Sequence, residues 1–262
     1  MPDWRASALV LVGHGSTRNR ASRLPTEHLA DKLRTRALFA EVRACFLKEK
    51  PFLDGALDDL SAATAYVVPN FAGQGYLTRE VVPREMGLTG PVTHRTGRNP
   101  RLVHYAAPVG THPRIPQILR TRALTILQDL GVRPREACIL LIGHGSGRPG
   151  GSAETPEAIA AALRSAGDFG EVRTAYLEQE PRVADWSRTV RSRYVVVAPL
   201  LVAEGLHGSE DLPPLFGMEP GRTGAGEAAG RLIWFCGGIG SGEDIVDIVL
   251  DLVRACDAAE VP

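Results

Sequence analysis

Residues 11–16 read LVGHGS, and residues 141–146 read LIGHGS, 130 positions further along the chain. The same offset holds from residue 11 to residue 115 and aligns several further landmarks: Glu41 with Glu171, Pro69 with Pro199, and Gly110 with Gly240. One offset kept over such a length indicates an internal duplication. We therefore expect the 262 residues to form two domains, at 1–131 and 132–262.

Each copy contains short apolar runs rich in β-branched residues, which are typical of buried strands. These runs lie at 8–12, 42–47, 65–68 and 102–106, and at 138–142, 172–177, 194–198 and 232–236. Their continuous apolar character favours parallel sheets covered on both faces. Segments of helical length and period lie at 22–38, 51–62, 118–130, 153–164 and 244–255, and Pro51 and Pro181 suit first helical turns. The sequence thus predicts an α/β fold, with a four-stranded parallel sheet flanked by helices in each copy.

Charge and composition exclude several classes of protein. The 30 basic and 30 acidic residues give a net charge of +0, which argues against a nucleic-acid surface or a basic membrane face. No apolar run approaches the roughly 20 residues of a membrane span, and the early Asp3 is unlike a signal peptide. We expect a cytoplasmic protein. Its four scattered cysteines are expected to be buried, reduced thiols.

Three polar residues of the second copy follow successive predicted strands: His144, Glu178 and His207. Ligands of open parallel sheets bind beyond the carboxyl ends of the strands, so these side chains are expected to converge. Two imidazoles and a carboxylate suit Fe, Co, Ni or Zn. Three protein ligands leave one coordination position open, as in reactive metal sites. The competing interpretation makes His144 a loop residue that caps a helix.

The first copy serves as an internal control. His14 matches His144, but Lys48 stands opposite Glu178 and Leu77 stands opposite His207. A cation and an aliphatic side chain cannot complete the ligand set, so we assign the chemistry to the second copy.

The remaining polar and glycine-rich motifs are given structural interpretations. Ser16 and Ser146 are expected to cap the following helices or to bind an anion there. Residues 237–242 read GGIGSG, which misses the dinucleotide fingerprint and lacks the lysine of a phosphate-binding loop, so no nucleotide is expected. The histidines outside the constellation are expected to be loop or structural residues: His94, His104 and His112.

Three ordered motifs of the second copy resemble a known family. They are GHGS after a strand, YLE followed shortly by Pro181, and V-x-P-L-x-x-x-E-G-L-H ending at His207. Together they resemble the CbiX-type class II tetrapyrrole chelatases, the sirohydrochlorin cobaltochelatases and ferrochelatases, with two tandem chelatase-like domains. The resemblance implies insertion of Co²⁺ or Fe²⁺, with Ni²⁺ as a further option, into a sirohydrochlorin-type tetrapyrrole in cobalamin or siroheme biosynthesis, without nucleotide hydrolysis. It places the metal on His144 and His207, with Glu178 as the acidic residue.

The substrate of such an enzyme carries peripheral carboxylates, which need cationic partners. Arg18 and Arg148 follow the two GHGS motifs at matching positions and are the candidates. Ser146 and His14 are further candidates for substrate binding. Two fused copies are expected to form a cleft holding the active site within one chain, so the protein is expected to be a pseudo-dimeric monomer. The alternative is a non-catalytic metal or tetrapyrrole carrier, or a regulatory paralogue.

Overall fold

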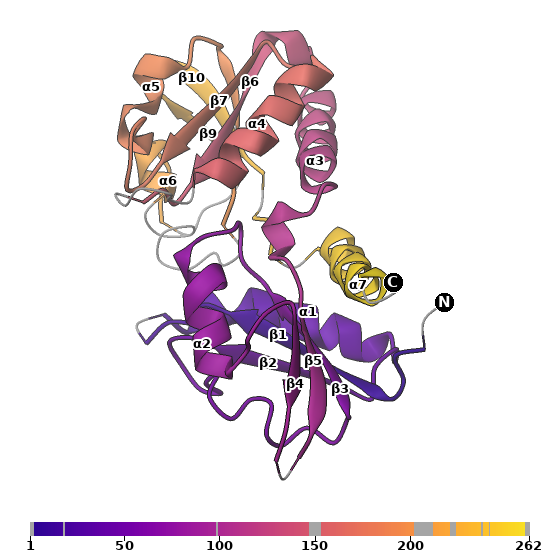
Figure 1. The fold of residues 1–262 in the computed structure, drawn as a ribbon. Helices are drawn as coiled ribbons and strands as arrows, with labels where there is room; N and C mark the ends of the chain where they lie inside the picture. Colours follow the sequence, from indigo (N-terminus) through magenta and orange to yellow (C-terminus); the bar gives the residue numbers. More distant parts are fainter. Residues whose placement is uncertain are drawn as a thin grey trace. The chain divides into compact units, whose positions relative to one another are not determined.

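The computed structural model describes residues 3–17, 19–97, 99–146, 153–201, 212–220, 224–236, 238–240 and 242–259. The chain forms two compact units (Figure 1). The first unit combines Met1–His112 with Gly240–Pro262, and the second consists of Pro113–Ile239. None of the helices in these described ranges is both long enough and apolar enough to cross a membrane.

Each unit contains a five-stranded sheet. The first has the order β2-β1-β3-β5-β4 and the second the order β7-β6-β8-β10-β9. The strands of the first sheet are β1 (Ser7–Gly13), β2 (Glu41–Phe46), β3 (Thr64–Pro69), β4 (Val92–Arg95) and β5 (Arg101–Tyr105). Those of the second are β6 (Ala137–Gly143), β7 (Glu171–Tyr176), β8 (Tyr194–Pro199), β9 (Ala225–Ala228) and β10 (Arg231–Phe235).

The predicted parallel strands are confirmed in both sheets. All pairs among β1, β2, β3 and β5 are parallel, as are those among β6, β7, β8 and β10. The sequence missed a fifth strand in each sheet, because β4 and β9 are short, partly exposed edge strands without an apolar run. Both pair antiparallel with their neighbours.

The helices are α1 (Leu24–Thr35), α2 (Val82–Met86), α3 (Ile115–Asp129), α4 (Glu154–Ala166), α5 (Trp186–Thr189), α6 (Leu212–Leu215) and α7 (Glu243–Ala258). The helix predicted at 51–62 is wrong, because this segment forms turns. Pro51 does not begin a helix: it follows a cis peptide bond, and its carbonyl accepts a hydrogen bond from Phe46 N at 2.8 Å. Pro181 is also cis, and its carbonyl accepts from Tyr176 N at 2.9 Å.

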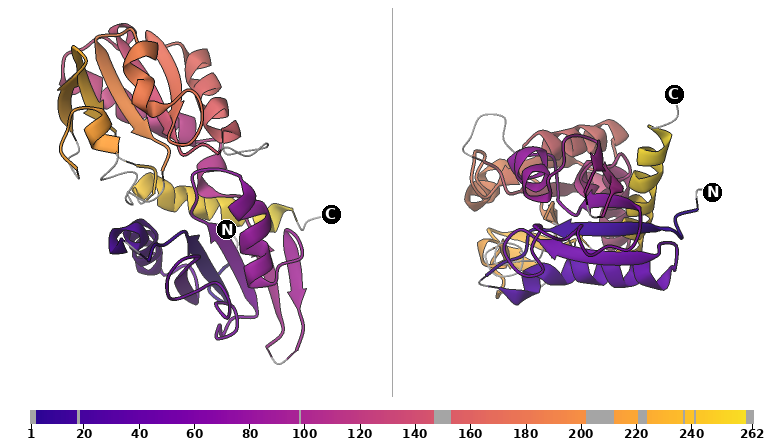
Figure 2. Two further views of the ribbon diagram at one scale, coloured as in Figure 1. Left: turned by 90° about the vertical axis from the view of Figure 1, so that its left-hand side faces the viewer. Right: turned by 60° about the horizontal axis from the view of Figure 1, so that its bottom comes forward.

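The compact units differ from the sequence repeats because each repeat gives its last helix to the other unit. Helix α3 follows the first sheet in the chain but belongs to the second unit, whereas α7 belongs to the first unit. The yellow helix α7 lies against the indigo-to-violet elements of that unit, including α1 and β3 (Figures 1 and 2). On the second unit, α3 packs against α4.

Polar contacts fasten both ends of α7. Asp257 near its carboxyl end accepts hydrogen bonds from Trp4 Nε1 at 2.9 Å and from the Tyr66 hydroxyl. Glu243 in its first turn pairs with Lys32 at 2.9 Å and with Arg36 at 3.1 Å, both on or directly after α1. The apolar face between these ends is buried, so α7 is an integral part of the first unit's core.

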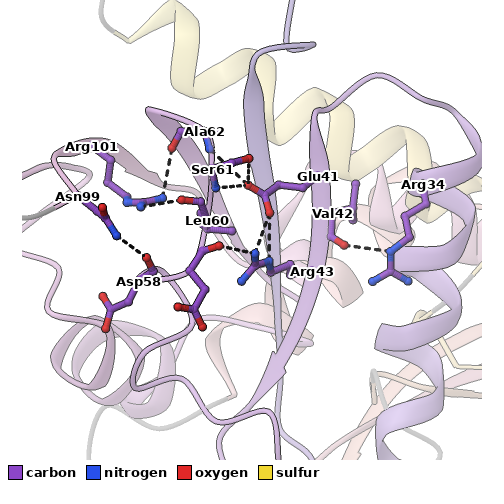
Figure 3. Close-up of polar contacts among 11 residues, drawn as sticks. Arg34, Glu41, Val42, Arg43, Asp58, Leu60, Ser61, Ala62, Asn99 and Arg101 are labelled. Atoms are coloured by element: carbon purple, nitrogen blue, oxygen red, sulfur yellow. Dashed lines mark hydrogen bonds and ion pairs between the residues drawn. The ribbon is translucent and has the colours of Figure 1, made fainter.

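A polar clamp closes the amino end of the first sheet (Figure 3). We use this name for Glu41, Arg43, Ser61, Ala62 and Arg101. One oxygen of Glu41 accepts from Ser61 N at 2.7 Å, Ser61 Oγ at 3.0 Å and Ala62 N at 3.3 Å, and the other accepts from Arg43. The guanidinium of Arg101 donates to the Ala62 and Leu60 carbonyls.

The second unit repeats this clamp with the residues 130 positions further on. Glu171 accepts from Arg191 N and Ser192 Oγ, each at 3.0 Å, and Arg231 donates to the Val190 carbonyl. Both copies therefore keep the contacts that hold the loop before β3 and β8 to the sheet.

The expected burial of the cysteines is confirmed for Cys45, Cys138 and Cys236, and no cysteine of the described chain forms a disulfide. Burial raises the pKa of Cys45 to about 12, so this thiol stays protonated. Cys256 is only partly buried.

Candidate functional site

The second sheet brings His144 and Glu178 to one edge. Strand β6 lies between β7 and β8, so the carboxyl ends of these three parallel strands are neighbours. The ladder between β6 and β7 continues beyond the strands: Leu177 N donates to the Gly143 carbonyl at 3.2 Å, and Glu178 N donates to the His144 carbonyl at 2.9 Å. These bonds fix His144 and Glu178 side by side.

The two side chains are close and accessible to solvent. His144 Nδ1 lies 3.7 Å from Glu178 Oε2, and the side chains are 43% and 60% exposed. Such an arrangement can bind a cation or exchange a proton with a ligand. Because both groups are open to water, their mutual attraction adds little to the stability of the fold.

A backbone contact selects the tautomer of His144. Nδ1 lies 3.2 Å from the Gly145 carbonyl, which can only accept a hydrogen bond. The contact therefore requires the tautomer with hydrogen on Nδ1, which leaves the lone pair on Nε2. Glu178 is on the Nδ1 side of the ring, so Nε2 is not engaged by this carboxylate.

Several predicted site residues lie outside the described residues: His207, Arg148 and Arg18. In the described ranges, no three His, Cys, Asp or Glu side chains approach closely enough to hold a metal ion.

Neither GHGS serine is the N-cap of a following helix, so this part of the expectation is wrong, whereas anion binding stays a prediction. Helices α1 and α4 have Arg23 and Ala153 at their N-caps, without a side-chain hydrogen bond. Ser16 Oγ instead accepts from Asn19 N at 3.2 Å, in the turn before the short helix Arg20–Arg23.

The first unit repeats the backbone of the site with other side chains. His14 Nδ1 lies 2.8 Å from the Gly15 carbonyl, and Lys48 N donates to the His14 carbonyl at 3.0 Å. Exposed Lys48 thus occupies the place of Glu178. Leu77 begins a π-helical turn, Leu77–Val81. The backbone geometry is kept, but a lysine replaces the carboxylate of the pair.

Sequence reasoning missed Gln179 and its counterpart Glu49. Gln179 Oε1 accepts from Ser146 N at 2.9 Å, and Glu49 Oε1 accepts from Ser16 N at 2.9 Å. The only signal in the sequence is their place directly after Glu178 and Lys48 in the two repeats.

Among the other histidines, His104 is a buried structural residue, and two glycines of the 237–242 stretch accept hydrogen bonds at their carbonyls. His104 is 1% exposed and stacks on Tyr66 with ring centroids 4.8 Å apart. The Gly240 carbonyl accepts from Asn70 Nδ2 at 3.4 Å, and the Gly238 carbonyl accepts from Arg122 at 3.1 Å. Residues 237 and 241 of that stretch lie outside the described chain.

Comparisons with known proteins agree with the duplication. The CbiX family matches residues 8–126 and again residues 138–256. A relative from Halobacterium salinarum, described as "Probable sirohydrochlorin cobaltochelatase", is 34% identical over 271 residues, covering 96% of this chain and 91% of the relative. A sirohydrochlorin cobaltochelatase of Methanopyrus kandleri is 35% identical over 86 residues, covering 31% of this chain and 59% of that protein.

Solved structures share the fold. DR2241 from Deinococcus radiodurans, a multi-domain protein with structural similarity to chelatases, has a TM-score of 0.74 and 28% identity. The match covers 94% of this chain, which spans 54% of that larger protein. SirB from Bacillus subtilis, solved with Fe³⁺, has a TM-score of 0.70 and 18% identity and covers 96% of both chains, a likeness of fold alone.

Proposed function

The chain belongs to the CbiX family over both of its halves, and from this premise we propose that it is a chelatase that inserts Co²⁺ or Fe²⁺ into sirohydrochlorin. The reaction replaces two pyrrole protons of the macrocycle by one divalent ion and needs no nucleotide. We assign it to the lyases and to cobalamin or siroheme biosynthesis. The relative from Halobacterium salinarum, 34% identical over 96% of this chain, supports the choice of substrate.

One observation carries the proposal. His144 and Glu178 lie 3.7 Å apart at the carboxyl ends of neighbouring parallel strands, which is where open α/β sheets bind their ligands. The repeat without this pair, with Lys48 at the matching position, keeps the same backbone contacts. The difference between the repeats is therefore chemical, and it concerns residues that handle a cation.

The mechanism follows from the donor atoms. In the tautomer set by the Gly145 carbonyl, Nε2 of His144 offers a lone pair to the incoming metal or to a pyrrole proton. The carboxylate of Glu178 stabilises the imidazolium formed when Nε2 takes a pyrrole proton, and the exposed imidazolium then returns that proton to water. His207 is proposed as the second metal ligand.

We further propose that cations hold the peripheral carboxylates of the tetrapyrrole. Arg18 and Arg148 follow the two GHGS motifs and suit this role, because a guanidinium binds a carboxylate with two hydrogen bonds. Ser146 and His14 complete the proposed substrate contacts.

The test is anaerobic metallation of metal-free sirohydrochlorin, followed by absorbance, with Co²⁺, Fe²⁺ and Ni²⁺ in turn. We expect turnover above the spontaneous rate, lost in His144→Ala and in His207→Ala. Leu77→Ala is the matched control in the first repeat and should retain turnover. Full activity in both histidine variants would overturn the assignment of the site. A chain that binds sirohydrochlorin tightly but never exceeds the spontaneous rate is a carrier instead.

A further inference from the structure

The peptide between Gly145 and Ser146 is held from both sides. Its N–H donates to Gln179 Oε1 at 2.9 Å, and its carbonyl lies 3.2 Å from His144 Nδ1. The peptide is planar, with N–H and C=O pointing in opposite directions. Fixing the N–H therefore fixes the direction of the carbonyl, and with it the position and tautomer of the imidazole.

The side chain of Gln179 also packs across Gly145. A Cβ at this glycine would lie 2.7 Å from Gln179 Cγ and 3.0 Å from Tyr176 Cβ. Gly145 has a φ of +78°, which glycine adopts without strain. The glycine thus brings its peptide into reach of Gln179, and the glutamine then prevents the peptide from rotating.

The first repeat holds the matching peptide through the same two contacts, but with another side chain as the acceptor. Glu49 Oε1 accepts from Ser16 N at 2.9 Å, and the Gly15 carbonyl lies 2.8 Å from His14 Nδ1. The second oxygen of Glu49 faces Arg23 Nη1 at 3.3 Å. The residue 130 positions after Arg23 is Ala153. At the second site an amide therefore supplies the acceptor and adds no second carboxylate beside Glu178.

We propose that Gln179 is a positioning residue for His144, acting through the Gly145–Ser146 peptide to keep Nε2 directed at the ligand. This role rests on the proposed function, in which Nε2 meets the metal or a pyrrole proton. Gln179 itself touches neither. Residues that orient a metal-binding histidine in this way commonly change metal affinity 10- to 100-fold when they are removed.

The experiment compares Gln179→Ala, Gln179→Glu and the first-repeat control Glu49→Ala in the full chain. NMR at pH 8 reads hydrogen exchange at the Ser146 amide and the tautomer of His144, and Co²⁺ titration reads affinity. Gln179→Ala should lose protection of the Ser146 amide, populate both tautomers of His144 and weaken Co²⁺ binding at least tenfold. Gln179→Glu keeps the acceptor and should restore the protection.

Glu49→Ala should change the signals of Ser16 and His14 and leave those of Ser146 and His144 as in the wild type. The proposal is overturned if Gln179→Ala keeps the protection and the single tautomer, or if Glu49→Ala disturbs His144 to the same extent. A wild-type chain that fails to metallate sirohydrochlorin contradicts the proposed function alone, because the NMR readouts need neither metal nor tetrapyrrole.

Discussion

The polar clamp of the first unit yields a prediction for stability. Glu41→Ala removes the acceptor for Ser61 N, Ser61 Oγ and Ala62 N, and the partner of Arg43. Ala62 is 7% exposed, so its N–H would be left buried without a partner, which costs about 1–3 kcal/mol. Hydrogen bonds to an ionised group contribute about 1.5–3 kcal/mol each. Ser61 is exposed and can turn to water, so we expect a net loss of about 3 kcal/mol.

This loss converts into a measurable change in melting temperature. For a chain of this size, 1 kcal/mol corresponds to about 2–4 °C, so Glu41→Ala should melt about 6–12 °C lower in calorimetry at pH 7. Glu85→Ala is the control, because the Arg84–Glu85 pair is exposed and contributes about 0–1 kcal/mol. A Glu41→Ala protein that melts within about 4 °C of the wild type, the range expected of the control, would refute the reasoning.

Three further predictions follow from the described contacts. Burial opposes the ionisation of Glu41 and Glu171 most strongly, but their hydrogen bonds together outweigh it and hold both pKa values below the ordinary range. The stability that the two carboxylates contribute is complete above about pH 5 and is lost as the pH falls through the folded pKa. The melting temperature of Glu41→Gln should therefore depend less on pH than that of the wild type. Asp257→Ala removes the acceptor of both hydrogen bonds, from Trp4 and Tyr66, that hold the carboxyl end of α7, and should speed amide exchange in that helix. An unchanged exchange pattern would contradict the anchoring role of Asp257. Gly145→Ala should weaken Co²⁺ binding at least tenfold, whereas Gly87→Ala, with φ +64° and nothing within 4 Å of its Cβ, should only lower the melting temperature.

The parallel strands were predictable because continuous apolar runs have one favourable environment, a sheet covered on both faces. The segment 51–62 misled the prediction, since its leucines recur at helical spacing but Leu53, Leu57 and Leu60 reach the core from successive turns. The exchange of α3 and α7 was not predictable. The sequence of an amphipathic helix does not indicate which of two similar sheets the helix covers.

The candidate site also contains two residues that the sequence predicts and one that it does not. His144 and Glu178 were predictable because a parallel sheet brings the residues that follow its strands to one edge. Gln179 was not, because a neutral amide in a loop has no chemical signature of its own. Its role depends on the direction of one backbone N–H, which appears only in three dimensions.

The exchange of helices has a consequence for the order of folding during synthesis. The second unit is continuous in sequence, from Pro113 to Ile239, so all of its residues are translated before α7. The first unit begins earlier but needs Glu243–Ala258 to cover its sheet. Domains generally fold as units while the chain grows. The half of the protein that is translated first is therefore the half completed last, after every residue of the unit bearing His144 and Glu178 has been translated.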